Sequence, residues 1–180
     1  MSPSHPHTEN RPGSDDEGNV ISRQLKQSVE ALAAGDLSAW EPLPLAARWS
    51  HLSKILPEPS SPVAGTLLGQ PATFVSWPAT GHLPTGATIW MQHDTVVLID
   101  ARDPQIESAA LEALGPPIQK MSSGLGSSYS QWLYPTRGLI VHASYDGSRI
   151  KRLFGLEALS TNAMKAAPII SISEQRIRRS

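Results

Sequence analysis

Apolar residues recur at helical spacing near the start of the chain. Between residues 19 and 35 they are Ile21, Leu25, Val29 and Leu32. Asn19 is a favourable N-cap and Gly35 a favourable C-terminal residue, so the pattern predicts an amphipathic helix over 19–35. A similar pattern predicts a second helix over 45–56, ending before a proline. Residues 1–18 hold no apolar residue after the first methionine and predict a disordered tail.

Short runs rich in β-branched and aromatic residues predict six strands farther along. They are residues 73–77, 87–91, 95–100, 131–134, 139–143 and 150–154. Two polar turns, 92–94 and Asp146-Gly147, predict hairpin connections between them. Asp103 as N-cap and Pro104 at the first helical position predict a third helix over 105–114, which Gly115 and the prolines after it would end.

The same order of signals occurs twice. Leu-Gly-x-Pro at 68–71 and again at 114–117 leads to a run with tryptophan, then a glycine, then two apolar strands around a polar turn. Such self-similarity predicts duplicated units, about 43–100 and about 103–156, that share one core. The expected fold class is α+β: two tandem helix-plus-antiparallel-meander repeats forming a sheet of about six strands, with helices packed on one face.

The end of the chain completes this organisation. Residues 156–167 predict a short helix or ordered arm, and three isoleucines at 169–172 predict a last short strand. A single globular α+β domain is therefore expected over 19–172. Residues 173–180 form a basic C-terminal tail.

The second unit resembles a known family. Its Leu-Gly-Pro-Pro motif at 114–117, Trp132-Leu133-Tyr134, the strand at 139–143, and Asp146-Gly147 before the strand at 150–154 are similar to the helix-plus-sheet modules of SmpA/OmlA-type (BamE-like) lipoproteins. They are also similar to the tandemly repeated β-lactamase-inhibitory protein. The match covers about 40 residues well and roughly 90 weakly. The resemblance implies a related fold and a binding or scaffold role, with no catalytic residues to transfer.

Composition excludes several classes of protein. The chain has no cysteine, which excludes disulfides, a thiol nucleophile and lipidation at a lipobox; the resembled proteins are exported and are lipidated or disulfide-bonded. No run approaches the ~18 apolar residues of a membrane helix, and the polar N-terminus is unlike a signal peptide. We therefore expect a cytoplasmic protein without membrane contact. No metal or cofactor is expected; His5 and His7 have a spacing that could contact a metal, but a lone His-x-His in a polar tail usually binds none.

Charge is distributed unevenly along the chain. The formal net charge is −1, but residues from Arg137 onward carry eight Lys or Arg against three acids. Their balance of +5 leaves −6 on the first 136 residues. This split is compatible with a basic patch that meets an acidic partner or a phosphate backbone, and also with a solvated strand face and a basic tail.

No catalytic signature occurs. Serines are common, and His82, His93 or His142 could approach one, but a Gly-x-Ser-x-Gly elbow is absent. The glycines at 124–126 lead into a strand and lack the Lys of a phosphate-binding loop. A hydrolase would have to place its site in the loops at 78–86 and 120–130.

Aromatic and basic residues of the second unit suggest a binding surface. The candidate interface residues are Trp132, Tyr134, Arg137, His142, Tyr145 and Arg149. Trp, Tyr and Arg dominate binding hot spots, and residues 132 and 134 share one face of a strand, where they are either core or interface. For His142, a half-buried structural position is the alternative.

These features together predict a non-enzymatic protein-binding module, such as an immunity or inhibitor protein that neutralises a partner protein, for example a toxin with an acidic surface. Two alternatives remain. One is a small hydrolase with its site in the two loops, and the other is a nucleic-acid binder that uses the basic C-terminal portion.

Overall fold

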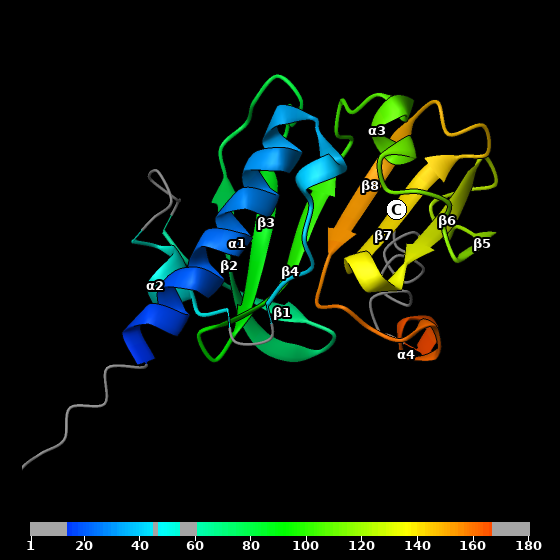
Figure 1. Cartoon of the computed structure of the whole chain (residues 1–180). Coiled ribbons are helices and arrows are strands. Elements are labelled where there is room, and N and C mark those ends of the chain that lie inside the picture. The colour runs from blue at the N-terminus through cyan, green and yellow to red at the C-terminus, as the bar shows by residue number, and fades with distance from the viewer. Residues whose placement is uncertain (1–13, 45–46, 55–60, 167–180) are drawn as a thin grey trace, which may run out of the picture.

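Eight strands form one antiparallel sheet in a computed structural model, which describes residues 14–44, 47–54 and 61–166 (Figure 1). In chain order they are β1 (Val63–Leu67), β2 (Gln70–Trp77), β3 (Ala87–Gln92), β4 (Thr95–Arg102), β5 (Gln119–Ser122), β6 (Tyr129–Tyr134), β7 (Leu139–Ser144) and β8 (Ile150–Gly155). Their order across the sheet is β1-β2-β3-β4-β8-β7-β6-β5. Two four-stranded meanders therefore lie side by side and meet where β4 pairs with β8.

The sheet has eight strands where about six were expected. All six predicted strands are present as β2, β3, β4, β6, β7 and β8. The two additional strands, β1 and β5, are the edges of the sheet. Both are short, and most of their side chains are exposed or half-buried. Their sequences lack the apolar pattern of a strand because an edge strand packs few side chains.

One long helix and three short ones lie in the described residues. They are α1 (Ser14–Ala34), α2 (Trp49–Leu52), α3 (Ser108–Glu112) and α4 (Thr161–Ala166), with 3₁₀ turns η1 (Leu37–Ala39) and η2 (Pro135–Arg137). The first helix was expected to begin at Asn19, but it begins at Ser14, inside the predicted disordered tail. The rest of that tail, the ends of the predicted second helix, the predicted strand at 169–172 and the basic tail at 173–180 lie outside the described residues.

The third helix starts later than predicted. Glu107, and not Asp103, is its N-cap residue. The backbone N–H of Asp103 donates to the carbonyl of Lys151, and its carboxylate accepts from the Lys151 ammonium at 2.7 Å. These contacts hold residue 103 beside β8 directly after the end of β4, in a left-handed conformation with φ of +44°, so the helix does not begin there. Gly115, with φ of +75°, follows its end as expected.

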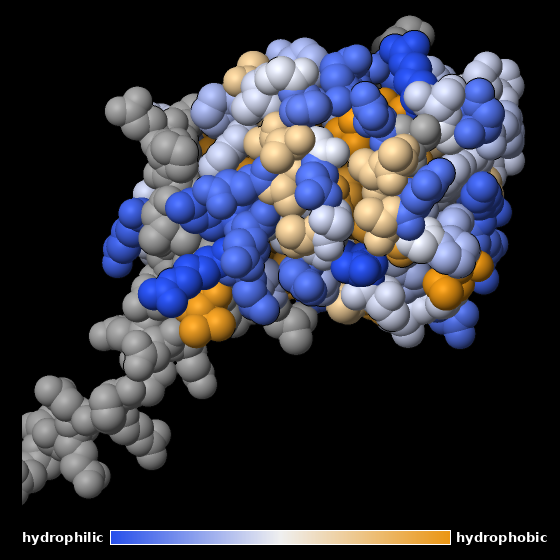
Figure 2. Space-filling model, turned by 45° about the horizontal axis from the view of Figure 1, so that its top comes forward, coloured by the Kyte–Doolittle hydropathy of each residue, from blue (hydrophilic) through white to orange (hydrophobic). Residues whose placement is uncertain are grey.

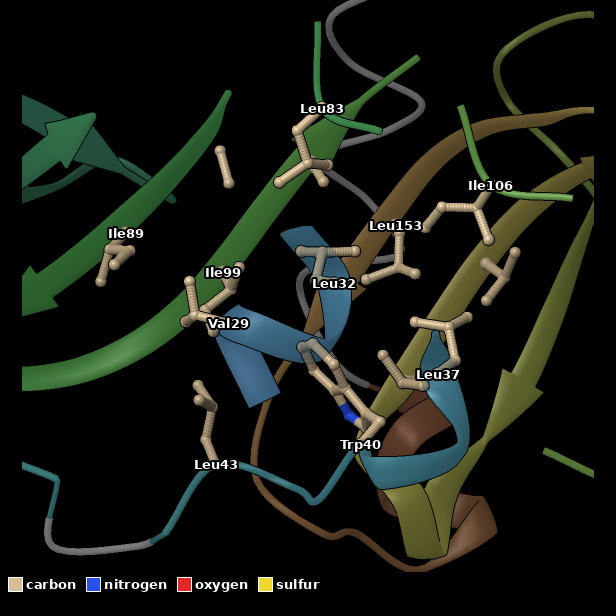
Figure 3. Close-up of a cluster of buried hydrophobic side chains, with 14 of the residues drawn as sticks. Val29, Leu32, Leu37, Trp40, Leu43, Leu83, Ile89, Ile99, Ile106 and Leu153 are labelled. Carbon is tan, nitrogen blue, oxygen red and sulfur yellow. The ribbon is translucent and has the colours of Figure 1, made fainter. Parts of the chain in front are cut away.

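Each face of the sheet carries its own hydrophobic core. On the first face, residues such as Ile89, Ile99 and Leu153 pack against Val29 and other side chains from α1 (Figure 3). The second face holds Leu98, Leu133, Ile140 and Phe154, which form a cluster with Met164 of α4. The expectation of helices on one face is therefore wrong for α4, because its buried methionine belongs to the opposite core.

Trp40 connects the first core to the joint between the meanders. Its side chain is fully buried, and its indole N–H donates to the carbonyl of Arg137 at 3.0 Å. The ring lies against Gly155, which pairs with Ile99 of β4 and Leu139 of β7. A Cβ atom at Gly155 would lie 2.5 Å from the ring, so a larger residue has no room there.

Replacing Gly155 with alanine should destabilise the fold. The added methyl group must displace the Trp40 ring or the β8 backbone, and overpacking of this kind costs about 1–3 kcal/mol. Urea denaturation measures the loss. Gly81→Ala is the matched control, because a Cβ there meets open space, and its effect should stay within about 0.5 kcal/mol. Equal effects of the two substitutions would show that Trp40 does not press on β8.

Candidate functional site

A cleft of about 540 Å³ lies beside α3 on the first face of the second meander. Its lining includes Leu111 and Glu112 of α3, Lys120 of β5, Trp132 and Tyr134 of β6, and Asp146 in the turn after β7. Prolines 116 and 117 form part of another wall. Figure 2, in which the top of the Figure 1 view comes forward, shows hydrophobic residues visible between hydrophilic ones on this side of the molecule.

The cleft results from the connection between β4 and β5. Four strand spacings separate β4 from β5, roughly 19 Å, because β8, β7 and β6 lie between them. Residues 103–118 cross this distance over the first face, with α3 in the middle. The buried side chains of Leu111 and Leu114 anchor the crossing to the core. The cleft is the space between this anchored segment and the outer strands β5 and β6.

The tryptophan of the cleft is held on three sides. Trp132 donates its indole N–H to the Ser130 hydroxyl at 2.6 Å, two residues earlier on the same strand face. Lys120, its register partner on β5, places an ammonium 3.8 Å from the centre of the ring. Gly147 lies against the ring edge, where a Cβ would come within 3.0 Å, and its φ is +73°. The ring is therefore fixed in orientation before any ligand arrives.

The tyrosine of the cleft has an unused polar group. Tyr134 is 3% exposed, and its hydroxyl oxygen has no hydrogen-bond partner among the described residues. Burial raises the pKa of this phenol to about 12, so it stays protonated at neutral pH. A buried hydroxyl without a partner costs free energy.

Carboxylates outnumber ammonium groups in the lining. Asp146 accepts hydrogen bonds at Oδ1 from the Ser144 hydroxyl and from both the backbone N–H and the hydroxyl of Ser148. These bonds lower the pKa of Asp146 to about 2, so it carries its charge at any physiological pH. Glu112, exposed on α3, adds a second acid, and Lys120 is the one base in the described lining.

The six predicted interface residues do not form one surface. Trp132 and Tyr134 line the cleft together, and exposed Tyr145 lies in the turn beside Asp146 but is not among the lining residues. Arg137 donates a hydrogen bond to the Trp40 carbonyl at 3.2 Å, so its side chain holds the segment that carries the buried tryptophan. Arg149 is exposed and lies 3.5 Å from the Asp103 carboxylate.

His142 belongs to a separate polar cluster on the second face. It is fully buried rather than half-buried, and its Nδ1 lies 2.7 Å from the Ser123 hydroxyl. Arg152, its neighbour on β8, makes a bidentate pair with Asp100 at 2.8 and 2.7 Å. Burial and the Arg152 charge lower the pKa of His142 to about 4, with Asp100 opposing them.

Sequence reasoning missed Glu112 and Asp146 as parts of a site, and it placed Lys120 only in the loop of the hydrolase alternative. Asp146 was recognised only as a turn residue, and Lys120 lay in a segment interpreted as a loop. Lys120 reaches Trp132 only because β5 pairs with β6 in one register. The composition of a polar edge strand does not specify that register. One feature of the sequence could have indicated the site. The Asp146-Gly147 turn and the aromatic strand at 131–134 belong to the same predicted meander, so an acid could be expected near the aromatic residues.

Comparison with known proteins gives one distant similarity. No protein-family model and no curated protein matches the sequence. Among solved structures, the chain is similar to a DUF4309 family protein, YjgB, from Bacillus subtilis subsp. subtilis str. 168. The identity is 14%, the similarity covers 76% of this chain and 97% of that chain, and the TM-score is 0.41. A similarity this distant carries no argument about the site.

Within the described ranges, no helix has the length and apolar character needed to cross a membrane. Groups of three or more potential metal-ligating side chains are likewise absent from residues 14–44, 47–54 and 61–166. His5 and His7 lie outside these ranges.

Folded stability should fall between pH 6.5 and 4 because of His142. An unfolded chain binds a proton on this imidazole near pH 6.5, whereas the folded chain resists it until about pH 4. Stability is therefore retained above pH 6.5 and falls as the pH drops, by roughly 3 kcal/mol across the window.

Urea denaturation at several pH values should show a flatter profile for His142→Gln. His82→Gln, which leaves His142 in place, is the control and should keep the wild-type slope. An NMR titration of the intact fold that placed the pKa of His142 near 6.5 would contradict this assignment.

Tyr134→Phe should leave stability unchanged or raise it by about 1 kcal/mol, because it deletes a buried hydroxyl that has no partner. Ser28→Ala is the contrasting variant. The Ser28 hydroxyl both donates to and accepts from the backbone of Glu41, so its loss should cost about 1–3 kcal/mol. Thermal or urea denaturation compares the two, and a large loss in Tyr134→Phe would mean that the hydroxyl is bonded in the fold.

Proposed function

We propose that this chain is a non-enzymatic protein-binding module that receives part of a partner protein in the cleft beside α3. The observation that carries the proposal is the pair of aromatic side chains in an open cleft, one of which holds a buried hydroxyl without a partner among the described residues. Tyrosine and tryptophan supply much of the energy of protein interfaces because they combine large contact area with a polar group.

The lining of the cleft favours binding over catalysis. Its described residues include no histidine, serine or cysteine, so a serine or cysteine nucleophile paired with a histidine base is not found there. Its volume of about 540 Å³ lies within the range of ordinary ligand sites and could hold one or two side chains of a partner. The ring of Trp132 is already oriented, which reduces the entropy lost on binding.

The narrower role of immunity or inhibitor protein follows from the resemblance to the β-lactamase-inhibitory protein and is part of this proposal. The cytoplasmic location and the duplication of one helix-plus-meander unit also belong to this proposal. The duplication is supported by the four-stranded meander in each half and by the short helices α2 and α3 that precede the two meanders.

The basic C-terminal part of the sequence suggested a partner with an acidic surface. The structure supports this expectation less well than it supports binding in the cleft. Lys151 and Arg149 both approach the Asp103 carboxylate, and Arg152 is buried in its pair with Asp100. An acidic partner or a nucleic acid would have to compete with these carboxylates for the same cations. The basic residues at 176–179 lie outside the described residues.

A hydrolase is the second candidate, and the contact between Ser123 and His142 favours it. Only Ser123 lies in the predicted loop at 120–130, because His142 is on β7; Ser123 is 9% exposed and His142 is fully buried. A pKa of about 4 makes His142 a weak base at neutral pH, and the nearby Asp100 is bound to Arg152 and does not orient the imidazole. The 78–86 loop places His82 elsewhere, against the Gln105 carbonyl at 3.0 Å.

Affinity capture from the native host, followed by mass spectrometry, tests the proposal. The wild-type chain should retain one protein in stoichiometric amount. Glu112→Lys, which reverses a charge in the cleft, should reduce its recovery at least about tenfold, because charge reversal at an interface suppresses a matched partner. Glu41→Lys makes the same change at an exposed residue outside the cleft lining and should retain the partner.

Equal recovery of the partner protein by the wild-type chain and by Glu112→Lys would show that the interface lies outside the cleft. Recovery of nucleic acid that salt removes would favour the nucleic-acid alternative.

A further inference from the structure

We infer that the cleft beside α3 accepts a cationic side chain, an arginine or lysine of the partner. The inference rests on the proposed function and specifies its chemistry. Two aromatic rings, Trp132 and Tyr134, and two carboxylates, Glu112 and Asp146, line the same hollow. Aromatic faces and carboxylates both attract cations, so the two kinds of group favour the same ligand.

The protein already places a cation on the tryptophan. The Lys120 ammonium lies 3.8 Å from the ring centre of Trp132, within the range of a cation–π contact. Lys120 is exposed and belongs to an edge strand, so its side chain can leave the ring without disturbing the core. It therefore marks a cation position that an incoming guanidinium or ammonium could take over.

The carboxylates distinguish a cation from other ligands. An anionic side chain in the cleft would meet two acids and one base. A purely apolar side chain would cover Asp146 and Glu112 and would leave the Tyr134 hydroxyl without a hydrogen bond. Both alternatives carry a desolvation cost that a cation avoids.

The Tyr134 hydroxyl is a buried acceptor without a partner among the described residues, at the wall of the same cleft. A turn of its side chain toward the cleft would let this protonated phenol accept a hydrogen bond from a guanidinium or an ammonium. Arginine fits best because its planar guanidinium can stack on an indole while its N–H groups reach acceptors at the edge.

Titration with N-acetylarginine N-methylamide, followed by NMR, tests the inference. The indole N–H signal of Trp132, assigned with Trp132→Phe, and the amide signal of Gly147 should shift with millimolar affinity. The leucine and glutamate analogues should bind at least about tenfold more weakly, because they lack a charge that the rings and acids attract.

Lys120→Met sharpens the test. It removes the competing cation, so arginine binding should tighten several-fold, while Glu112→Gln should weaken it several-fold. Lys165→Met, an equal charge change in α4 on the other face, should leave it unchanged. A site for anions would respond to Lys120→Met in the opposite direction, by losing affinity.

The inference is overturned if the leucine or glutamate analogue binds this cleft as well as the arginine analogue, if Lys120→Met weakens arginine binding, or if arginine shifts neither signal. Partner capture that still depends on Glu112 would in each case preserve the proposed function. Conversely, the arginine analogue could bind at Trp132 while Glu112→Lys still captures the partner as well as the wild-type chain does. That result would overturn the proposed function and leave the inference standing.

Discussion

The pairing of β4 with β8 is the constraint on which the rest of the structure depends. It is the only ladder between the two meanders in the described residues, and it spans four residue pairs, from Ile99 with Gly155 to Arg102 with Arg152. Trp40 covers the joint on the first face, and the bidentate Asp100–Arg152 pair lies across it on the second. A buried ion pair adds little net stability, but losing one partner leaves an uncompensated charge and costs about 3–5 kcal/mol. Any other pairing of β4 that separated Asp100 from Arg152 would carry that cost.

The cleft is a consequence of that joint. Because β4 joins β8 rather than β5, the chain must cross three strands before it can begin the outer edge of the second meander. A short helix anchored by Leu111 and Leu114 covers part of this distance and leaves a hollow above Trp132 and Tyr134. The binding site that we propose is thus built on a rigid sheet floor with an exposed helix as one wall, an arrangement that favours preorganised recognition.

The sequence predicted most of the sheet but little of the site. Strands such as β4, with its continuous apolar run, and turns such as Asp146-Gly147 follow from local chemistry and were found. The edge strands β1 and β5 were missed because neither the small residues of β1 nor the polar residues of β5 carry an alternating apolar pattern. The helix start at Asp103 failed because contacts with Lys151, distant in the sequence, outweighed its capping preference. Lys120 and Glu112 reach the aromatic pair through register and a crossover, neither of which a pattern of residues reveals.

The central claim is that Trp132 and Tyr134, although largely buried in the free chain, are the floor of a protein-binding cleft. An experimental structure of the chain with its captured partner tests this most directly. The account predicts a basic side chain of the partner between Trp132 and the carboxylates, with the Lys120 ammonium displaced from the ring and the Tyr134 hydroxyl bonded. A partner seated on the second face or along the β1 edge, with the cleft unoccupied, would contradict it.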